Sequence, residues 1–469
     1  MAKFKENREE QMMLLPPSLH DFVPEGHLAR LINMVVGRLD TTVIEDKYSE
    51  RGQNTYHPGI LIKLLFYGYA RGERSGRKIS QRCETDTAYM YLGQMYKPNF
   101  RTINDFRKNN IEELSEYFVE IVRISKEMGL LKIGQVNIDG TKLKANAANK
   151  LTMSKDGYEK WEKRIKEKIE KIIEEAESID EEEDRLYGDK RGDELPEEIN
   201  TSEKLNKKLE EIQKKREQIK EGEKQNYTDR DAQFMRNGRG QIEVGYNCQI
   251  GVTENRIIVG SEVIMDKADD KALELIVKTT EENVEQKVKE VAADAGYGTY
   301  ENYEYLSKEK KTGYIPDQSL RVQDKRKKNP YYHEHFRYDK DTDEYVCPEG
   351  KGLKRYKYYK KERKIAYRGV GCNECVKRSL CTKHKNRFIM RDERIELLKD
   401  MRQRLSTDQG KAKYGKRLYT VEPVFGHLKH NLGYRQFLLR GIKKVKAEFR
   451  LMCIGANLKK MQVLLAAQS

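Results

Sequence analysis

The chain has 469 residues, with 92 Lys and Arg against 77 Asp and Glu, so its formal net charge is +15. This basic excess favours a polyanionic partner without identifying it. With 37% apolar residues the chain can bury more than one core, which excludes a largely disordered protein despite 36% charged residues. No apolar run approaches the roughly 18 residues of a membrane helix, and the first residues lack a secretory pattern. We therefore expect a soluble, cytoplasmic protein without disulfide bonds.

Residues 1–130 are predicted to form an all-α N-terminal domain. Residues 28–39, 59–72 and 114–129 repeat apolar side chains at steps of three and four, as amphipathic helices do. The turns between these helices are expected to face solvent and carry the basic residues Arg71, Arg74, Arg77, Lys78, Arg101, Arg107 and Lys108. Such a unit suits binding of DNA ends or dimerisation. A helical scaffold with solvated charges is an equal alternative.

The pattern changes twice in the next hundred residues. Residues 131–154 contain a short β-rich run that ends in a carboxylate followed by glycine, and they form the first part of a predicted α/β core. Residues 155–224 hold 24 Asp and Glu against 18 Lys and Arg, with apolar residues at helical spacing. They predict an acidic, antiparallel helical hairpin inserted into the core. Gly188, Gly192 and Pro196 mark the expected connection between its helices.

Residues 225–320 are predicted to complete most of this core. Two β-like runs, 243–253 and 255–265, meet at a turn and indicate a hairpin. A helix, a buried strand, a second helix and a last short strand follow over residues 269–317. This order predicts a mixed sheet with helices packed against it, and ligands of such sheets bind at strand ends.

Two aspartates follow apolar runs, Asp139 in VNID and Asp294 in EVAAD, and each has a glycine within two residues. If the two strands are parallel neighbours, both carboxylates face the same end of the sheet. Carboxylates at the edge of a core are costly unless they are paired or bind a metal, so a divalent cation between them is one interpretation. The alternative is a pair of ordinary strand-terminating aspartates.

A third carboxylate lies in the C-terminal segment YGKRLYTVEPVFGHLKHNLGYRQFLLRG. Pro423 suits the first turn of a helix, which would place Glu422 at the helix start and Lys429 two turns along the same face. The flanking side chains that could hold phosphates are Tyr414, Arg417, Arg435 and Arg440. Taken alone, the segment is equally explained by a helix with an exposed Glu and Lys.

Several long motifs, in order, resemble a DDE transposase of a bacterial insertion sequence, closest to the family numbered eleven-eighty-two. They are LLPPSLHDFVPEGHLAR, YHPGILIKLLFYGYARG, IDGTKLKANA, NYTDRDAQFMRNGRGQIEVGYNCQIGV, ADAGY and TVEPVFGHLKHNLGYRQFLLRG. The motifs run over most of the chain. Several such motifs in order are far more specific than any one of them.

This resemblance implies an α/β, ribonuclease H-like core whose mixed sheet is interrupted by the helical hairpin and by a small cysteine-rich module. In such enzymes Asp, Asp and Glu bind two Mg²⁺ or Mn²⁺ ions, and the matching positions here are Asp139, Asp294 and Glu422. A metal pair activates the nucleophile and neutralises charge in phosphodiester cleavage, and carboxylates suit Mg²⁺. The implied activity is cleavage of DNA at insertion-sequence ends and strand transfer into target DNA. Asp229, in NYTDRDA, also matches a family motif and is taken as a structural or supporting residue.

One spacing departs from the family. The signature Tyr-x2-Arg-x3-Glu-x6-Lys appears here with four residues between Arg417 and Glu422. The resemblance carries over Lys429 as a phosphate contact, with a structural salt bridge as its rival. The resemblance also assigns Tyr414 and Arg417 to DNA contact, but the added residue rotates them by about 100° relative to Glu422 on a helix.

Residues 321–399 form a basic segment with four clustered cysteines, Cys347, Cys372, Cys375 and Cys381. The spacing x24, x2 and x5 predicts a structural four-cysteine zinc site, with His384 as a substitute for the last ligand and reduced, unliganded thiols as the alternative. The surrounding Lys, Arg and Tyr residues could contact phosphates and stack on bases, or form a solvated basic β-ribbon. Residues 400–469 are assigned to the C-terminal part of the catalytic core.

The charge is unevenly distributed along the chain. Residues 321–469 hold 39 Lys and Arg against 16 Asp and Glu, so the basic excess lies in the C-terminal third. Double-stranded DNA, as terminal inverted repeats and as target, is the expected partner, in a homodimer or larger synaptic complex. The function classes left open are the transposase, a ribonuclease H-like nuclease that cuts without joining, and a DNA-binding protein without chemistry. The transposase interpretation implies nucleoid association and a requirement for Mg²⁺ or Mn²⁺, whereas the structural zinc is inferred from the cysteine spacing alone.

Overall fold

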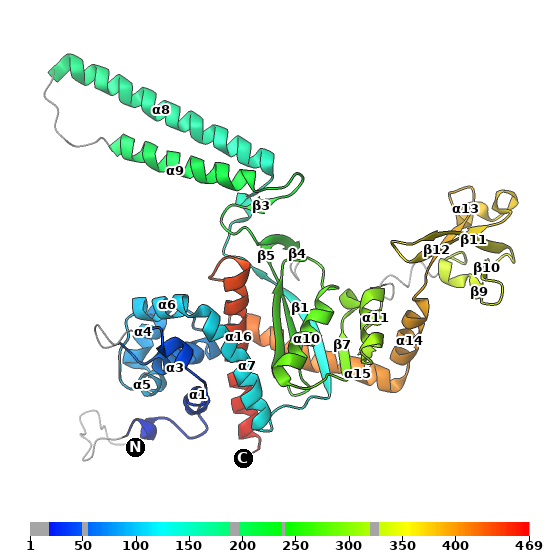
Figure 1. Cartoon of the computed structure of the whole chain (residues 1–469), viewed down its shortest axis with the longest axis horizontal. Coiled ribbons are helices and arrows are strands. Elements are labelled where there is room, and N and C mark those ends of the chain that lie inside the picture. The colour runs from blue at the N-terminus through cyan, green and yellow to red at the C-terminus, as the bar shows by residue number, and fades with distance from the viewer. Residues whose placement is uncertain (1–17, 49–54, 188–196, 237–239, 319–327, 469) are drawn as a thin grey trace, which may run out of the picture.

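A computed structural model describes residues 18–48, 55–187, 197–236, 240–318 and 328–468 (Figure 1). The predicted connection of the helical hairpin at Gly188, Gly192 and Pro196 lies outside these residues. The chain combines a helical N-terminal region, a mixed sheet with helices, a long helical hairpin and a small β module. None of the described helices is long and apolar enough to cross a membrane.

The N-terminal region is helical, as predicted, but Arg77, Lys78, Arg101, Arg107 and Lys108 lie within helices and not in turns between them. Its helices are α1 (Leu28–Val36), α2 (Thr42–Glu45), α3 (Pro58–Ala70), α4 (Gly76–Thr85), α5 (Thr87–Leu92), α6 (Phe100–Asn109) and α7 (Ile111–Glu127), preceded by the 3-10 turn η1 (Leu19–Phe22). Helix α3 begins with proline in its first turn, where a missing N–H costs nothing, and it is apolar on all sides. It is therefore the buried centre of this region, and the other helices cover it.

The main sheet holds β1 (Gln135–Lys144), β4 (Gln233–Arg236), β5 (Ile242–Val252), β6 (Ile258–Ile264), β7 (Glu290–Ala293) and β8 (Thr312–Tyr314). The strands lie side by side in the order β6, β5, β1, β7, β8. β4 also pairs with β5, along the residues that precede the segment paired with β6. β6, β5 and β1 are antiparallel neighbours, whereas β7 and β8 run parallel to β1. The predicted hairpin and mixed sheet are thereby confirmed.

Helices cover both faces of this sheet. α10 (Ala272–Val284) packs where Gly251 and Gly260 leave room, since a Cβ there would come within 2.8 Å and 2.4 Å of the Thr280 hydroxyl. α15 (Asp408–Gly426) lies on the other face, where the side chain of Gln135 donates to the Lys413 carbonyl. Because side chains alternate along a strand, Asp139 shares the α15 face with Gln135. α11 (Tyr300–Lys308) and α14 (Ile395–Ser406) pack together beside β8.

The C-terminal helix α16 (Ile442–Ala466) packs on α3, α7 and β6, so both ends of the chain share one core (Figure 1). A Cβ at Gly455 would lie 2.6 Å from the backbone of Tyr69 in α3, which shows how closely the two helices approach. The expectation that Arg74 faces solvent is wrong. Its side chain is only 13% exposed and pairs with the fully buried carboxylate of Glu448 at 2.9 Å, because α16 covers it.

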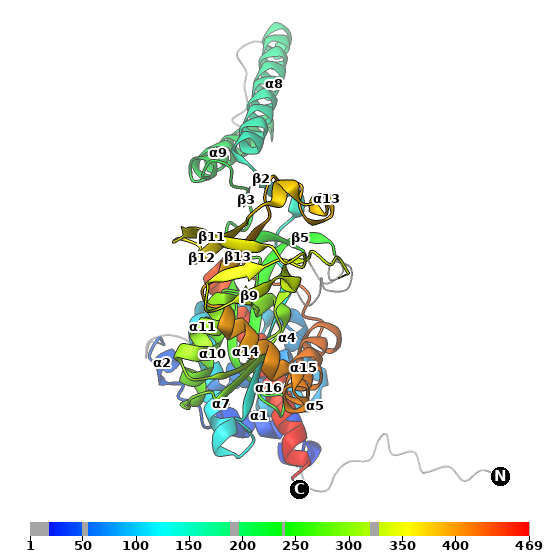
Figure 2. The ribbon, with the colours of Figure 1, turned by 90° about the vertical axis from the view of Figure 1, so that its right-hand side faces the viewer.

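The insertion is a helical hairpin of α8 (Lys155–Tyr187) and α9 (Glu197–Glu217) that projects from the rest of the chain in both views (Figures 1 and 2). Glu162, near the start of α8, contacts Gln213 and Arg216, near the end of α9, so the helices are antiparallel as predicted. The short strands β2 (Thr152–Met153) and β3 (Gln225–Asn226) pair at its base.

A five-stranded antiparallel sheet forms the cysteine-rich module. Its strands are β9 (Arg337–Asp339), β10 (Glu344–Val346), β11 (Gly352–Tyr359), β12 (Lys364–Gly369) and β13 (Phe388–Asp392). One face packs a small core of Phe336, Leu353, Tyr367 and Ile389. The 3-10 turn η6 (Cys372–Glu374) and the short helix α13 (Arg378–Cys381) lie between β12 and β13.

Candidate active site

The two aspartates predicted at strand ends come from neighbouring parallel strands. Only Asp294 follows the end of its strand; the expectation for Asp139 is wrong, because β1 continues to Lys144 and Asp139 lies inside it. β1 pairs with β7 up to Ile138 and Ala293; Asp139 is the next residue of β1, and Asp294 is the residue directly after β7. Gly140 N–H donates to an Asp139 carboxylate oxygen at 2.9 Å, and Gly296 N–H donates to Asp294 at 2.8 Å. The glycines therefore hold the carboxylates through backbone amides and add no side chain of their own.

Glu422 reaches the same face from α15, but the predicted helix boundary is wrong. α15 begins at Asp408, so Pro423 lies inside the helix and not in its first turn. An interior proline leaves the carbonyl four residues earlier without its helical donor. Arg256, in the turn between β5 and β6, donates from Nε to that carbonyl of Tyr419 at 2.7 Å. This contact between distant segments makes the interior proline tolerable, and the sequence gives no sign of it.

Arg417 lies against two of the three carboxylates. Its guanidinium lies 3.2 Å from an Asp139 oxygen and 4.0 Å from a Glu422 oxygen, and its side chain is only 8% exposed. The pKa of Arg417 is raised by Asp139, Tyr414, Asp294 and Glu422 against the opposing effect of burial. For Asp139 burial acts in the other direction: it is the main reason that the pKa of this carboxyl is raised to about 6, with Arg417 opposing the rise and the nearby Asp294 adding to it. One buried cation thus offsets several carboxylates that lie close together.

The expected DNA contacts take different positions around this cluster. Lys429 donates to the Thr141 hydroxyl of β1, and burial lowers the pKa of its ammonium group. The expectation that Lys429 lies two α-helical turns beyond Glu422 is wrong, because residues His427–Asn431 form a π-helical turn. Arg435 and Arg440 are exposed and bind the backbone carbonyls of Lys429 and Asn146 at 3.2 Å and 2.9 Å. Tyr414 lies beside Arg417, with 5.9 Å from the guanidinium to its ring.

A fourth carboxylate, Asp269, lies on the opposite face of β1, and sequence reasoning missed it. One of its oxygens accepts hydrogen bonds from Lys142, Asn247 and Gln249 at 2.7–2.8 Å. A Cβ at Gly140 would come within 2.8 Å of that oxygen, so the glycine beside Asp139 also makes room for Asp269. The only signal in the sequence was a pair of aspartates before a helix, which is common at helix starts.

Asp229 has a supporting position away from Asp139, Asp294 and Glu422. It is buried, and it accepts from the Tyr246 hydroxyl at 2.7 Å and from Gly441 N–H at 3.2 Å. Its contacts connect the strands after the hairpin to the start of α16. We therefore assign Asp229 to the framework of the fold.

The donor set at Asp139, Asp294 and Glu422 suits a hard divalent cation, because all three side chains offer carboxylate oxygens. Across the described residues, however, no group of three or more His, Cys, Asp or Glu side chains has the arrangement that holds a metal ion. At the carboxylates, the guanidinium of Arg417 lies against Asp139 and near Glu422. The residues fit a metal site in composition, and Arg417 supplies the compensating charge in this arrangement.

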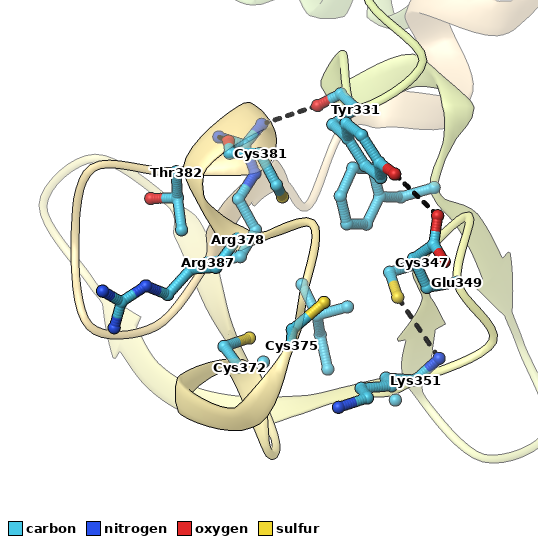
Figure 3. A pocket seen from close by; sticks show the side chains of 14 residues that line it. Tyr331, Cys347, Glu349, Lys351, Cys372, Cys375, Arg378, Cys381, Thr382 and Arg387 are labelled. Atoms are coloured by element: carbon cyan, nitrogen blue, oxygen red, sulfur yellow. Dashed lines mark hydrogen bonds between the residues drawn. The ribbon is translucent and has the colours of Figure 1, made fainter.

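The four clustered cysteines line one small pocket of the β module, as Figure 3 shows. Lys351 N–H donates to the Cys347 sulfur at 3.2 Å, and Cys375 N–H bonds the Cys372 carbonyl in a tight turn. A Cβ at Gly369 would lie 2.4 Å from the Cys372 sulfur, so only glycine leaves room for that thiol. The thiols are brought together from three segments, although they do not form a metal-holding arrangement.

Comparison with known families gives two matches. Residues 346–462 match the model of a Transposase DDE domain, which covers β11 to β13, the four clustered cysteines, Glu422 and Lys429. Residues 17–109 match a model described as a Transposase domain (DUF772), which covers α1 to α6. The comparisons with curated proteins and with solved structures found no match.

Proposed function

We propose that this chain is a DDE transposase that cuts DNA at the ends of its insertion sequence and joins them to target DNA, because both matched models describe transposase domains. We further propose that it belongs to the family numbered eleven-eighty-two and that its mixed sheet is of the ribonuclease H type. The observation that carries the proposal is the convergence of Asp139 and Glu422 on Arg417, with Asp294 on the next parallel strand.

Asp139, Asp294 and Glu422 would hold the divalent cations, Mg²⁺ or Mn²⁺, by their carboxylate oxygens. Bound there, two such ions activate the attacking oxygen and stabilise the charge that develops on the phosphate. Arg417 positions Asp139 by a charge-assisted hydrogen bond, and its charge lies 4.0 Å from a Glu422 oxygen. Lys429, fixed by Thr141 on the same face, is positioned to contact a phosphate next to the bond that is cut.

Arg435, Arg440 and Tyr414 extend the proposed DNA contacts beyond the carboxylates. The two arginines are exposed and held by backbone carbonyls, so their remaining N–H groups can meet phosphates. The substrate is double-stranded DNA, and a synaptic complex of two or more subunits would hold both ends. The alternative is a nuclease that cuts and does not join.

We also propose a structural zinc ion at Cys347, Cys372, Cys375 and Cys381. The shared pocket, the Lys351 N–H donated to sulfur and the space left by Gly369 support it, since four thiolates complete a tetrahedron. Metal analysis of the purified chain should find about one zinc per chain, and Cys375→Ser should lower this while Cys83→Ser, at a buried thiol elsewhere, should not. Zinc well below one equivalent in the unaltered protein would remove the proposal.

The function is tested with purified protein, Mg²⁺, a duplex carrying the terminal inverted repeat that flanks the reading frame, and a target plasmid. We expect a joined product. Asp139→Asn, Asp294→Asn and Glu422→Gln should each abolish it while leaving binding of the duplex within about threefold. Cleavage without joined product would establish the nuclease instead, and joining by any of the variants would remove that residue from the site.

A further inference from the structure

The outward face of the cysteine-rich module exposes aromatic side chains. Tyr356 is 54% exposed, Phe388 42% and Met390 49%. The opposite face of the same strands already packs the small core of the module, so these side chains are not needed to stabilise the sheet. Large apolar groups grouped on a surface generally mark a site of interaction.

A β-bulge sets the direction of Tyr356. The register of β11 against β12 shifts between Arg355 and Lys357, which leaves Tyr356 as an extra residue. Bulges of this kind redirect a side chain without breaking the sheet. Tyr356 thereby meets Phe388 of β13 edge to face at 5.7 Å, and the Arg368 guanidinium of β12 lies 4.9 Å above its ring. Three strands therefore build one exposed aromatic and cationic cluster.

The charge around the cluster is strongly positive. Residues 351–392 contain 15 Lys and Arg and only three Asp and Glu. Lys354, the cross-strand neighbour of Arg368, approaches a carboxylate of Glu344 only to 4.0 Å. A second copy of this face would be repelled by the first, whereas a polyanion would be attracted.

We propose that the Tyr356–Arg368–Phe388 face binds an unpaired strand of DNA by stacking on its bases. This proposal depends on the proposed function only because it assumes that the substrate is DNA. Duplex DNA offers this face its phosphates alone, because its bases are already stacked and paired, so exposed rings would gain little from it. An unpaired strand offers both phosphates for Lys354 and Arg368 and free base faces for the two rings. DNA opened next to a cut end is such a strand.

The test measures binding by the full chain without divalent metal, with a fluorescent 20-nucleotide single strand and with the same sequence as duplex. The variant Tyr356→Ala/Phe388→Ala should weaken single-strand binding about tenfold or more, since each stacked base contributes on the order of a tenfold factor. Duplex binding should change less than about threefold. Tyr356→Phe should keep nearly full affinity, because the ring and not the hydroxyl makes the contact.

The matched control is Tyr96→Ala, at an exposed tyrosine that also pairs edge to face, with Tyr56 in the N-terminal region. It should leave both affinities unchanged. Equal loss for strand and duplex, no loss for either, or a change in the oligomeric state of the double variant without loss of strand binding would each overturn the proposal. Joining activity is measured separately on the unaltered protein. If joining fails while aromatic-dependent strand binding persists, the proposed function falls and this inference stands.

Discussion

The contact of Arg256 with α15 gives the sharpest prediction about how Glu422 is positioned. Arg256 supplies the hydrogen bond that Pro423 withholds from the Tyr419 carbonyl, at 2.7 Å. A hydrogen bond from a charged donor contributes about 1.5–3 kcal/mol, and the exposure of Arg256 places it at or below the lower end. Arg256→Ala should therefore weaken the local stability of α15 by about 1–1.5 kcal/mol, a roughly tenfold increase in local opening.

Hydrogen exchange of the α15 amides measures this directly, and a second substitution supplies the test of mechanism. Pro423→Ala restores a backbone N–H that can bond the Tyr419 carbonyl, so in that background Arg256→Ala should cost less than about 0.5 kcal/mol. Lys416→Ala is the control, because Lys416 contacts Glu254 of the same turn at 3.0 Å without involving that carbonyl, and its effect should be the same in both backgrounds. An equal cost of Arg256→Ala with and without Pro423 would refute the reasoning.

Three further predictions concern stability and charge. Glu448→Ala removes the fully buried partner of Arg74, so it should lower the free energy of unfolding by about 3–5 kcal/mol in urea titrations; Glu116→Ala, at an exposed pair, should cost less than about 1 kcal/mol. Gly455→Ala places a Cβ 2.6 Å from the backbone of α3 and should lower the free energy of unfolding by about 1–3 kcal/mol. Gly415→Ala, whose Cβ would have nothing within 4 Å, should leave that free energy unchanged or raise it. A loss of stability in both variants would contradict the packing argument. Affinity for duplex DNA should fall steeply with salt, and charge-reversing substitutions in residues 321–469 should flatten that dependence more than equal changes in residues 18–130.

The parts of the fold that local sequence patterns determine were predicted well. Apolar runs followed by glycine located Asp139 and Asp294, and helical spacing located the hairpin insertion, because both signals arise from neighbouring residues. The interior position of Pro423 could not be predicted, since it depends on Arg256 of a turn more than 160 residues earlier. The burial of Arg74 depends in the same way on Glu448 at the other end of the chain.

In the candidate site, too, features set by neighbouring residues were predicted and features set by distant contacts were not. The family motif selected Asp139, Asp294 and Glu422 as candidates, but it did not predict that Arg417 lies close to both Asp139 and Glu422. The extra residue before Glu422 cast doubt on Arg417 as a DNA contact. Its buried side chain instead faces the carboxylates, a role that spacing alone cannot distinguish from contact with DNA. Asp269 was missed because its donors come from β1 and β5, which only the folded sheet brings together.

The central claim is that Asp139, Asp294 and Glu422 form one metal-dependent centre for DNA strand transfer. The most direct measurement is the joining of a labelled inverted-repeat end to a plasmid, with and without Mg²⁺, by the unaltered chain and by Asp139→Asn, Asp294→Asn and Glu422→Gln. The account predicts joined product only for the unaltered chain with Mg²⁺, and comparable binding of the end by all four proteins. Metal-independent joining, or joining by any one of the three variants at the unaltered rate, would contradict it.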